Sequence, residues 1–144
     1  MSNGSTSNGS TSNGSASAGT TASVSTHILD TSTGRPAPGV TVLLSARTGP
    51  DGRWTALGSA ATDADGRCTD LPAPPQDTTH VRLGFETEAY FSHRRAEARQ
   101  DAPRAGDSGA FFPEVTVTFA VSPGEHHHVP LLLSPFGYSV YRGS

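Results

Sequence analysis

Apolar and polar residues alternate in several short runs along this chain. Residues 24–29 alternate in this way, and so do residues 81–85 and 115–121. Successive side chains of an extended strand point to opposite faces, so a period of two predicts strands with two different faces. The β-branched, apolar run at residues 40–44 predicts a buried strand, and another strand is predicted to begin at residues 54–57.

Glycine and proline separate these runs. Loops are predicted at residues 33–39 and 72–75, and a turn is predicted at Pro123-Gly124. Asp51-Gly52 and Asp65-Gly66 are signals for hairpin turns, because glycine reaches positive φ at little cost. Seven or eight short strands, with a turn signal about every ten residues, predict an all-β fold, an antiparallel β-sandwich.

One helix is predicted within this pattern. It covers residues 89–100, which are rich in Ala, Arg and Glu, and the proline and two glycines of residues 101–109 predict a loop after it. A further short strand is predicted between the Asp65-Gly66 turn and the loop at residues 72–75, and it ends at Leu71. Near the C-terminus we expect an apolar strand, a turn and a second, aromatic strand.

The first 22 residues contain almost no apolar side chains. They form a near-repeat of Ser-Asn-Gly-Ser-Thr that starts at Ser2, Ser7 and Ser12. Such a segment cannot offset the entropy of ordering, so residues 1–22 are predicted to be a disordered tail ahead of one domain at residues 23–144. The tail also lacks the basic and apolar regions of a secretory signal.

The composition of the 144-residue chain narrows the classes of partner. A net charge of −3 at pH 7 argues against a nucleic-acid partner, which would require a basic stripe. No apolar run is long enough to cross a bilayer, so no membrane partner is predicted. The single cysteine, Cys68, cannot form an internal disulfide, which is compatible with a reducing, cytoplasmic compartment. We interpret Cys68 as a small apolar residue beside a turn rather than as a nucleophile.

Side chains suited to acid–base chemistry gather near the C-terminus. His126, His127 and His128 are consecutive, and strand alternation places His126 and His128 on one face and His127 on the other. The chain then stops at Tyr-Arg-Gly-Ser. Chain ends are usually frayed, so this density of polar groups suggests that the terminus is used in a site.

Five motifs together resemble the 5-hydroxyisourate hydrolases, the transthyretin-related enzymes of purine breakdown. In chain order they are Val24-Ser25-Thr26-His27-Ile28-Leu29-Asp30, Thr33-Gly34-Arg35-Pro36-Ala37-Pro38-Gly39-Val40, Thr62-Asp63-Ala64-Asp65-Gly66-Arg67, Phe111-Phe112-Pro113-Glu114-Val115 and the segment from Glu125 to Ser144. The terminal Tyr-Arg-Gly-Ser separates these enzymes from the hormone carrier transthyretin. The resemblance implies two four-stranded sheets with one short helix, and a homotetramer with its sites in a central channel.

The resemblance also implies an activity and the residues that perform it. The activity is metal-free and cofactor-free hydrolysis of 5-hydroxyisourate to 2-oxo-4-hydroxy-4-carboxy-5-ureidoimidazoline in urate degradation. Catalytic positions are matched by His27, Arg67, His128 and Ser144, and substrate-binding positions by His27, Arg67, Tyr141, Arg142 and Gly143.

These residue types suit that chemistry. Histidine has an ordinary pKa near neutrality, so His27 and His128 are predicted to share the acid–base work, and which of them is the base stays open. Arg67 offers a planar fork of donors to the substrate oxygens and to the oxyanion that forms on attack. The family often has tyrosine in place of His127, a change expected to matter little because this side chain points away from His128.

Other interpretations of the same residues stay open. His80 and His93 match no motif and are interpreted as surface histidines. His126 and His128, with one residue between them on a strand, could chelate zinc. The resemblance, in contrast, implies a site without metal. The alternative function is a transthyretin-type carrier that binds an aromatic ligand between subunits. Such a channel should be mostly apolar, unlike the polar groups that this chain supplies.

Overall fold

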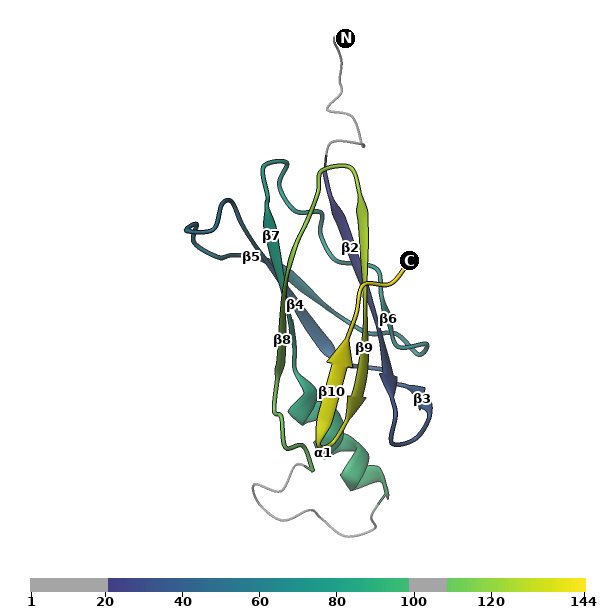
Figure 1. Cartoon of the computed structure of the whole chain (residues 1–144). Coiled ribbons are helices and arrows are strands. Elements are labelled where there is room, and N and C mark those ends of the chain that lie inside the picture. The colour runs from purple at the N-terminus through teal and green to yellow at the C-terminus, as the bar shows by residue number, and fades with distance from the viewer. Residues whose placement is uncertain (1–20, 99–108) are drawn as a thin grey trace.

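The structure, a computed structural model, describes residues 21–98 and 109–144. Two β-sheets pack face to face, and one helix lies at one end of them (Figure 1). In chain order the elements are β2 (Ser23–Asp30), β3 (Arg35–Pro36), β4 (Thr41–Arg47), β5 (Thr55–Ala61), β6 (Arg67–Cys68), β7 (His80–Phe85), α1 (Thr87–Ala98), β8 (Val115–Ala120), β9 (His126–Ser134) and β10 (Gly137–Val140). The predicted tail at residues 1–22 and the predicted loop at residues 101–109 lie almost entirely outside the described residues.

The predicted β-sandwich is confirmed, with one difference in its strand count. One sheet has the order β5-β4-β7-β8, and the other has the order β10-β9-β2-β3 with β6 also paired to β2. The second sheet therefore has five strands rather than the expected four. The reason is that two short strands divide the same edge of β2. β3 pairs with Leu29 and Asp30, and β6 pairs with Thr26 and His27.

The central strand pair of the five-stranded sheet is the exception to the antiparallel pairing of the sandwich. β2 and β9 run parallel, in continuous register from Ser23 opposite His126 to Asp30 opposite Leu133. Parallel neighbours need a long crossover, and here the crossover contains the whole four-stranded sheet and the helix. The two histidine-bearing segments of the sequence thus become direct neighbours (Figure 1).

The core lies between the sheets. It is formed by the side chains on the apolar face that alternation predicts for each strand. Ile28 and Leu131 from one sheet and Leu44, Leu83 and Phe85 from the other have no exposed surface. Removing one such side chain to alanine typically costs about 2–5 kcal/mol of stability. Because these side chains point inward, the residues that alternate with them on β2 and β9 point away from the core.

The Asp65-Gly66 turn differs from its prediction in a way that matters for the site. The turn forms, with Gly66 at φ +73 and its N–H donating to the Asp63 carbonyl at 2.9 Å. It is not a hairpin, because β5 and β6 belong to different sheets and β6 ends at Cys68 rather than Leu71. Ile28 N–H donates to the Gly66 carbonyl at 2.8 Å, so this turn docks on β2. A Cβ at Gly66 would lie 2.5 Å from the Ile28 carbonyl oxygen, and φ there is +73, so the position requires glycine.

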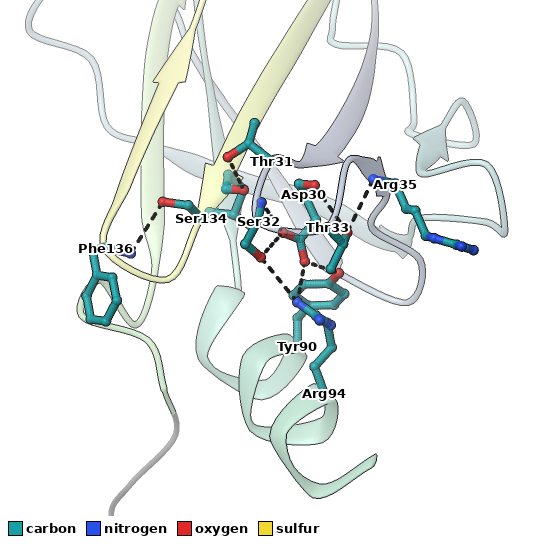
Figure 2. A network of polar contacts seen from close by, with 10 residues as sticks. Asp30, Thr31, Ser32, Thr33, Arg35, Tyr90, Arg94, Ser134 and Phe136 are labelled. Atoms are coloured by element: carbon teal, nitrogen blue, oxygen red, sulfur yellow. Dashed lines mark hydrogen bonds and ion pairs between the residues drawn. The ribbon is translucent and has the colours of Figure 1, made fainter. Parts of the chain in front are cut away.

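Helix α1 begins at Thr87, two residues before its predicted start, and is held to β2 by a buried carboxylate. Asp30 has no exposed surface and accepts hydrogen bonds from the Tyr90 hydroxyl and from Arg94 Nη1, each at 2.7 Å, and from Ser32 N–H at 2.9 Å (Figure 2). Burial alone would raise the pKa of Asp30. Hydrogen bonds from Ser32 and Tyr90 and the charge of Arg94 outweigh it, so that pKa lies below its ordinary value of 3.8.

Candidate active site

Strands β2, β6 and β9 bring the predicted catalytic side chains to the outer face of the five-stranded sheet. His27 lies opposite Arg67 in the β2–β6 pair, and Ser25 lies opposite His128 in the β2–β9 pair. Residues that are directly opposite on neighbouring strands have side chains on the same face. Since Thr26 and Ile28 point into the core, His27, Arg67 and His128 share the outer face. The register thus gives the three side chains a common face, and their convergence on a substrate stays a prediction.

The three consecutive histidines divide as alternation predicts. His127 is 4% exposed and points inward, where its ring lies beside that of Phe119 with 6.3 Å between centroids. Its Nε2 accepts from Ser122 N–H at 3.3 Å, across the turn that precedes β9. His126 and His128 lie on the outer face with Ser23 and Ser25. His127 therefore belongs to the core edge and not to the site face.

A row of hydrogen bonds joins these outer-face residues. Ser23 Oγ lies 2.6 Å from His126 Nδ1, Ser25 Oγ lies 2.8 Å from His126 Nε2, and Ser25 Oγ lies 2.8 Å from His128 Nδ1. Among the described residues, Nε2 of His128 takes part in no hydrogen bond, which leaves that nitrogen for a ligand. The sequence motifs include Ser25 and His126 but gave neither a role, and Ser23 lies just before the first motif. Strand alternation, which places residues 23, 25 and 27 on one face, is the signal that could have linked the two serines to His27.

The surroundings of His128 favour its neutral form. Burial lowers the pKa of His128 from its ordinary value of 6.5, and the positive charges of His27, His126 and Arg67 lower it further. A neutral imidazole with one free nitrogen can accept a proton from water at neutral pH.

The C-terminus closes the other side of His128. Gly143 N–H donates to the His128 carbonyl at 2.8 Å, and this bridge continues the register of the β9–β10 pair. A Cβ at Gly143 would lie 2.7 Å from Cδ2 of the His128 ring and 3.0 Å from Cγ of Pro130. The order across the sheet face is therefore the chain terminus, His128, His27 and Arg67.

The remaining terminal residues lie around this contact and are exposed. Arg142 Nη2 donates to Glu125 Oε1 at 3.1 Å. A cavity of about 240 Å³ lies beside His128 and is lined by residues 117–120, 127–129 and 140–142, which include Tyr141 and Arg142. Ser144 follows Gly143 directly and is exposed. Gly143 thus contacts His128, whereas the cavity lined by Tyr141 and Arg142 includes neither His27 nor Arg67 in its lining. The roles predicted for the terminal side chains stay predictions.

Cys68 and the possible metal ligands are the other residues that the sequence raised as candidates. Cys68 is 1% exposed on the inward face of β6, and burial raises the pKa of its thiol. In residues 21–98 and 109–144 no group of three or more His, Cys, Asp or Glu side chains is placed to hold a metal ion. No helix in the same part of the chain is long and apolar enough to cross a membrane.

Comparisons with known proteins identify the family of this chain. The profile of the HIUase/Transthyretin family matches residues 24–143. The chain is 43% identical over 123 residues to the 5-hydroxyisourate hydrolase of Salmonella dublin, across 84% of this chain and 80% of that protein. It superposes on the 5-hydroxyisourate hydrolase of Klebsiella pneumoniae with a TM-score of 0.61 at 37% identity, covering 84% of this chain and 98% of the other. The transthyretin of Sparus aurata gives a TM-score of 0.65 at 30% identity, covering 83% and 95%.

Proposed function

Because the chain belongs to the HIUase/Transthyretin family, we propose that it hydrolyses 5-hydroxyisourate, the substrate in the names of its relatives. Water adds to a carbonyl carbon of the purine-derived ring, the adjacent C–N bond opens, and the product is 2-oxo-4-hydroxy-4-carboxy-5-ureidoimidazoline. The observation that carries the proposal is the shared outer face of His27, Arg67 and His128, set by the pairing of β2 with β6 and β9.

His128 acts as the general base in this proposal. Its Nδ1 is engaged by Ser25 and its Nε2 is free, so Nε2 is the atom that takes a proton from the attacking water. The lowered pKa of His128 keeps the ring neutral and able to accept that proton. His27, two residues along β2 from Ser25, helps protonate the departing nitrogen. Acid–base catalysis of this kind contributes about 10²–10⁴ to a rate.

Arg67 and the C-terminus bind the substrate. The guanidinium of Arg67 stays protonated and offers several donors in one plane, which suits both the ring oxygens and the oxyanion formed on attack. Tyr141, Arg142, Gly143 and Ser144 hold the ring from the opposite side of His128, and Ser144 assists the reaction. The backbone contact of Gly143 with His128 supports this placement.

The assembly and location stay proposals as well. A homotetramer, implied by the family resemblance, would place the site face of one subunit near its neighbours. Exposed apolar side chains at the β10 end of the sandwich fit such contacts, because a sheet edge needs pairing or cover. They are Phe111, Phe136, Tyr138, Val140 and Tyr141. We place the protein in the cytoplasm from its sequence.

A transthyretin-type carrier is the second candidate, because a transthyretin superposes on the chain about as well as a hydrolase does. The two functions differ in the chemistry they need. A carrier of an aromatic ligand needs an apolar channel, whereas this sheet face presents three imidazoles and a guanidinium. The polar face favours the enzyme.

A direct assay tests the choice. Urate oxidase generates 5-hydroxyisourate, and its ultraviolet decay is followed with the intact chain, with a chain that ends at Val140, and with the intact chain after chelator treatment. We expect the intact chain to accelerate the decay, the shortened chain to lose most of the acceleration, and the chelator to have no effect. Decay at the spontaneous rate with the intact chain would favour the carrier, and sensitivity to the chelator would favour a metal site.

A further inference from the structure

Ser25 lies between two histidines, and the row of which it is part leads from the candidate site to the surface. The parallel register places Ser23 opposite His126 and Ser25 opposite His128, so serines and imidazoles interleave along the strand pair. Ser25 is 6% exposed, and both of its histidine contacts are partly buried. The Ser23–His126 contact at the far end is exposed. One end of the row thus meets the site and the other meets solvent.

The proton positions along this row depend on one another. A serine hydroxyl has one proton, so Ser25 donates to one imidazole and accepts from the other. If His128 carries its proton on Nδ1, Ser25 accepts that proton's hydrogen bond and donates to His126 Nε2. His126 then carries its proton on Nδ1 and donates to Ser23. This arrangement leaves Nε2 of His128 unprotonated, and the reverse arrangement places a proton there.

The proposed reaction has a proton to remove. Water supplies a hydroxyl group to the carbonyl carbon and a proton to the departing nitrogen. The resulting carboxylic acid is ionised at neutral pH, and a ureido nitrogen is too weak a base to keep an extra proton. Each turnover therefore releases one proton. Arg67, on the same face as His128, makes the site a poor place for that proton to remain, because a positive charge disfavours another one.

We propose that Ser25, with His126 and Ser23, forms a proton wire that holds Nε2 of His128 unprotonated and carries its excess proton to solvent. The inference rests on the proposed hydrolase function. In the step, the water proton moves to His128 Nε2 and the Nδ1 proton moves to Ser25, whose own proton passes to His126 Nε2. The His126 Nδ1 proton then moves to Ser23, whose hydroxyl proton goes to solvent. These transfers leave the row in the reverse arrangement; after the product leaves, His128 Nε2 gives its proton to water in the open site, and the row takes one proton back from solvent through Ser23. The proton of the new carboxylic acid restores His27, so the net release is one proton per turnover. Ser25 is a positioning residue, since it acts through His128.

Three serine variants test the wire. Ser25→Ala breaks the row, Ser25→Thr keeps a hydroxyl at the same position, and Ser45→Ala is a matched control from the middle of β4 in the other sheet. We expect Ser25→Ala to lower kcat by roughly tenfold or more with KM within about twofold, since the loss lies in proton transfer rather than substrate binding. Ser25→Thr should recover most of this loss, and Ser45→Ala should match wild type.

Two further measurements separate a wire from a merely structural role. The dependence of kcat on the deuterium fraction of the solvent should be curved in wild type, because several protons move, and straight in Ser25→Ala. Nitrogen-15 NMR of the His128 ring should show the proton on Nδ1 in wild type and a shift toward Nε2 in Ser25→Ala. The NMR measurement does not require turnover, and thermal melting of each variant checks that it folds.

Each outcome assigns a cause. If wild type is active and Ser25→Ala matches its kcat and its deuterium dependence, the wire is overturned and the hydrolase function stands. An unchanged His128 tautomer in Ser25→Ala also overturns the wire. Equal losses in Ser25→Ala, Ser25→Thr and Ser45→Ala would reduce the effect to general damage to the sheets. A wild-type chain without turnover overturns the hydrolase function, and the conducting role falls with it.

Discussion

Strand β2 carries two polar clusters that use hydrogen bonds in opposite ways. At its end, Asp30 points inward and is surrounded by donors from Tyr90, Arg94 and Ser32 (Figure 2). On its outer face, Ser25 and His27 lie beside His128, whose Nε2 has no partner among the described residues. The first cluster is closed and fixes a charge. The second leaves one nitrogen open.

This comparison indicates that the Asp30 cluster stabilises the fold, whereas the His128 cluster keeps an atom available for catalysis. A buried carboxylate is tolerated only when donors satisfy it, and removing such a partner is costly because a charge is left unpaired. Leaving one nitrogen of a half-buried neutral imidazole without a hydrogen bond costs less free energy than leaving a buried charge unpaired, so the imidazole can keep a free lone pair. Variants in the Asp30 cluster should therefore change stability without changing activity, and variants around His128 should do the reverse.

The largest effect is expected at the open cluster. His128→Ala removes the proposed base and should lower kcat by about 10²–10⁴, with the melting temperature close to that of wild type. Urate-oxidase-coupled ultraviolet assays and thermal melting measure the two quantities. His93→Ala is the matched control, because His93 is exposed on α1 and its one ion pair within residues 21–98 and 109–144 is with Glu97, at 3.3 Å. Full turnover by His128→Ala would remove this mechanism.

The closed cluster should respond in the opposite sense. Tyr90→Phe removes one donor to the Asp30 carboxylate, and a hydrogen bond to a charged group is worth about 1.5–3 kcal/mol. We expect that loss in the free energy of unfolding in urea, while kcat per folded molecule stays unchanged. Tyr138→Phe removes a hydroxyl from an exposed tyrosine and serves as the control. A Tyr90→Phe protein with normal stability and reduced kcat would break the distinction between the two clusters.

How far these clusters could be foreseen from sequence depends on the range of the interaction. Alternation is local, so it correctly separated His127 from its two neighbours. The hydrogen bond between Ser25 and His128 joins residues 103 positions apart, and nothing in either segment signals that their strands pair in parallel. Asp30 belonged to a motif, but its partners lie on a helix about 60 residues later, and only packing reveals that it is buried.

The sequence correctly predicted a turn at Asp65-Gly66, but it did not predict which strands the turn connects. Asp65-Gly66 makes a turn because glycine reaches φ +73 there, and that requirement is local. The turn leads from one sheet to the other instead of closing a hairpin, because β6 finds its partner in β2. That change of sheet is what places Arg67 opposite His27. The candidate residues could thus be named from the family motifs, while their common face required the strand order.

A smaller loss of activity is expected when a side chain is added at Gly143, which packs against the His128 ring. Gly143→Ala places a Cβ where only 2.7 Å separates it from Cδ2 of His128, so the terminus or the ring must move. We expect kcat/KM to fall roughly tenfold, because small misplacements of catalytic groups are costly, and stability to change little at the chain end. Coupled assays and urea unfolding test both parts. Gly137→Ala is the control, since the nearest atom to a Cβ there is Ser134 Oγ at 3.9 Å.

The smallest effects are expected on changing the pH. Acidification should lower activity through the His128 cluster and stability through the Asp30 cluster, for different reasons. The pKa of His128 lies below 6.5 through burial and the charges of His27, His126 and Arg67, so its neutral form persists below that pH. The acid limb of kcat/KM should therefore lie below 6.5. Stability should fall later on acidification, because Asp30, with its lowered pKa, contributes stability above 3.8 that is lost as pH falls through its folded value.

Measuring kcat/KM and the melting temperature over the same pH range checks the order of these two losses. Activity should fall first, while the melting temperature is still high, since protonating His128 removes the base but leaves the Asp30 cluster intact. Tyr90→Phe should bring the loss of stability to higher pH by removing a bond that favours the Asp30 carboxylate, and should leave the activity limb in place. If both limbs moved together in this variant, the open and closed clusters of β2 would be one coupled unit.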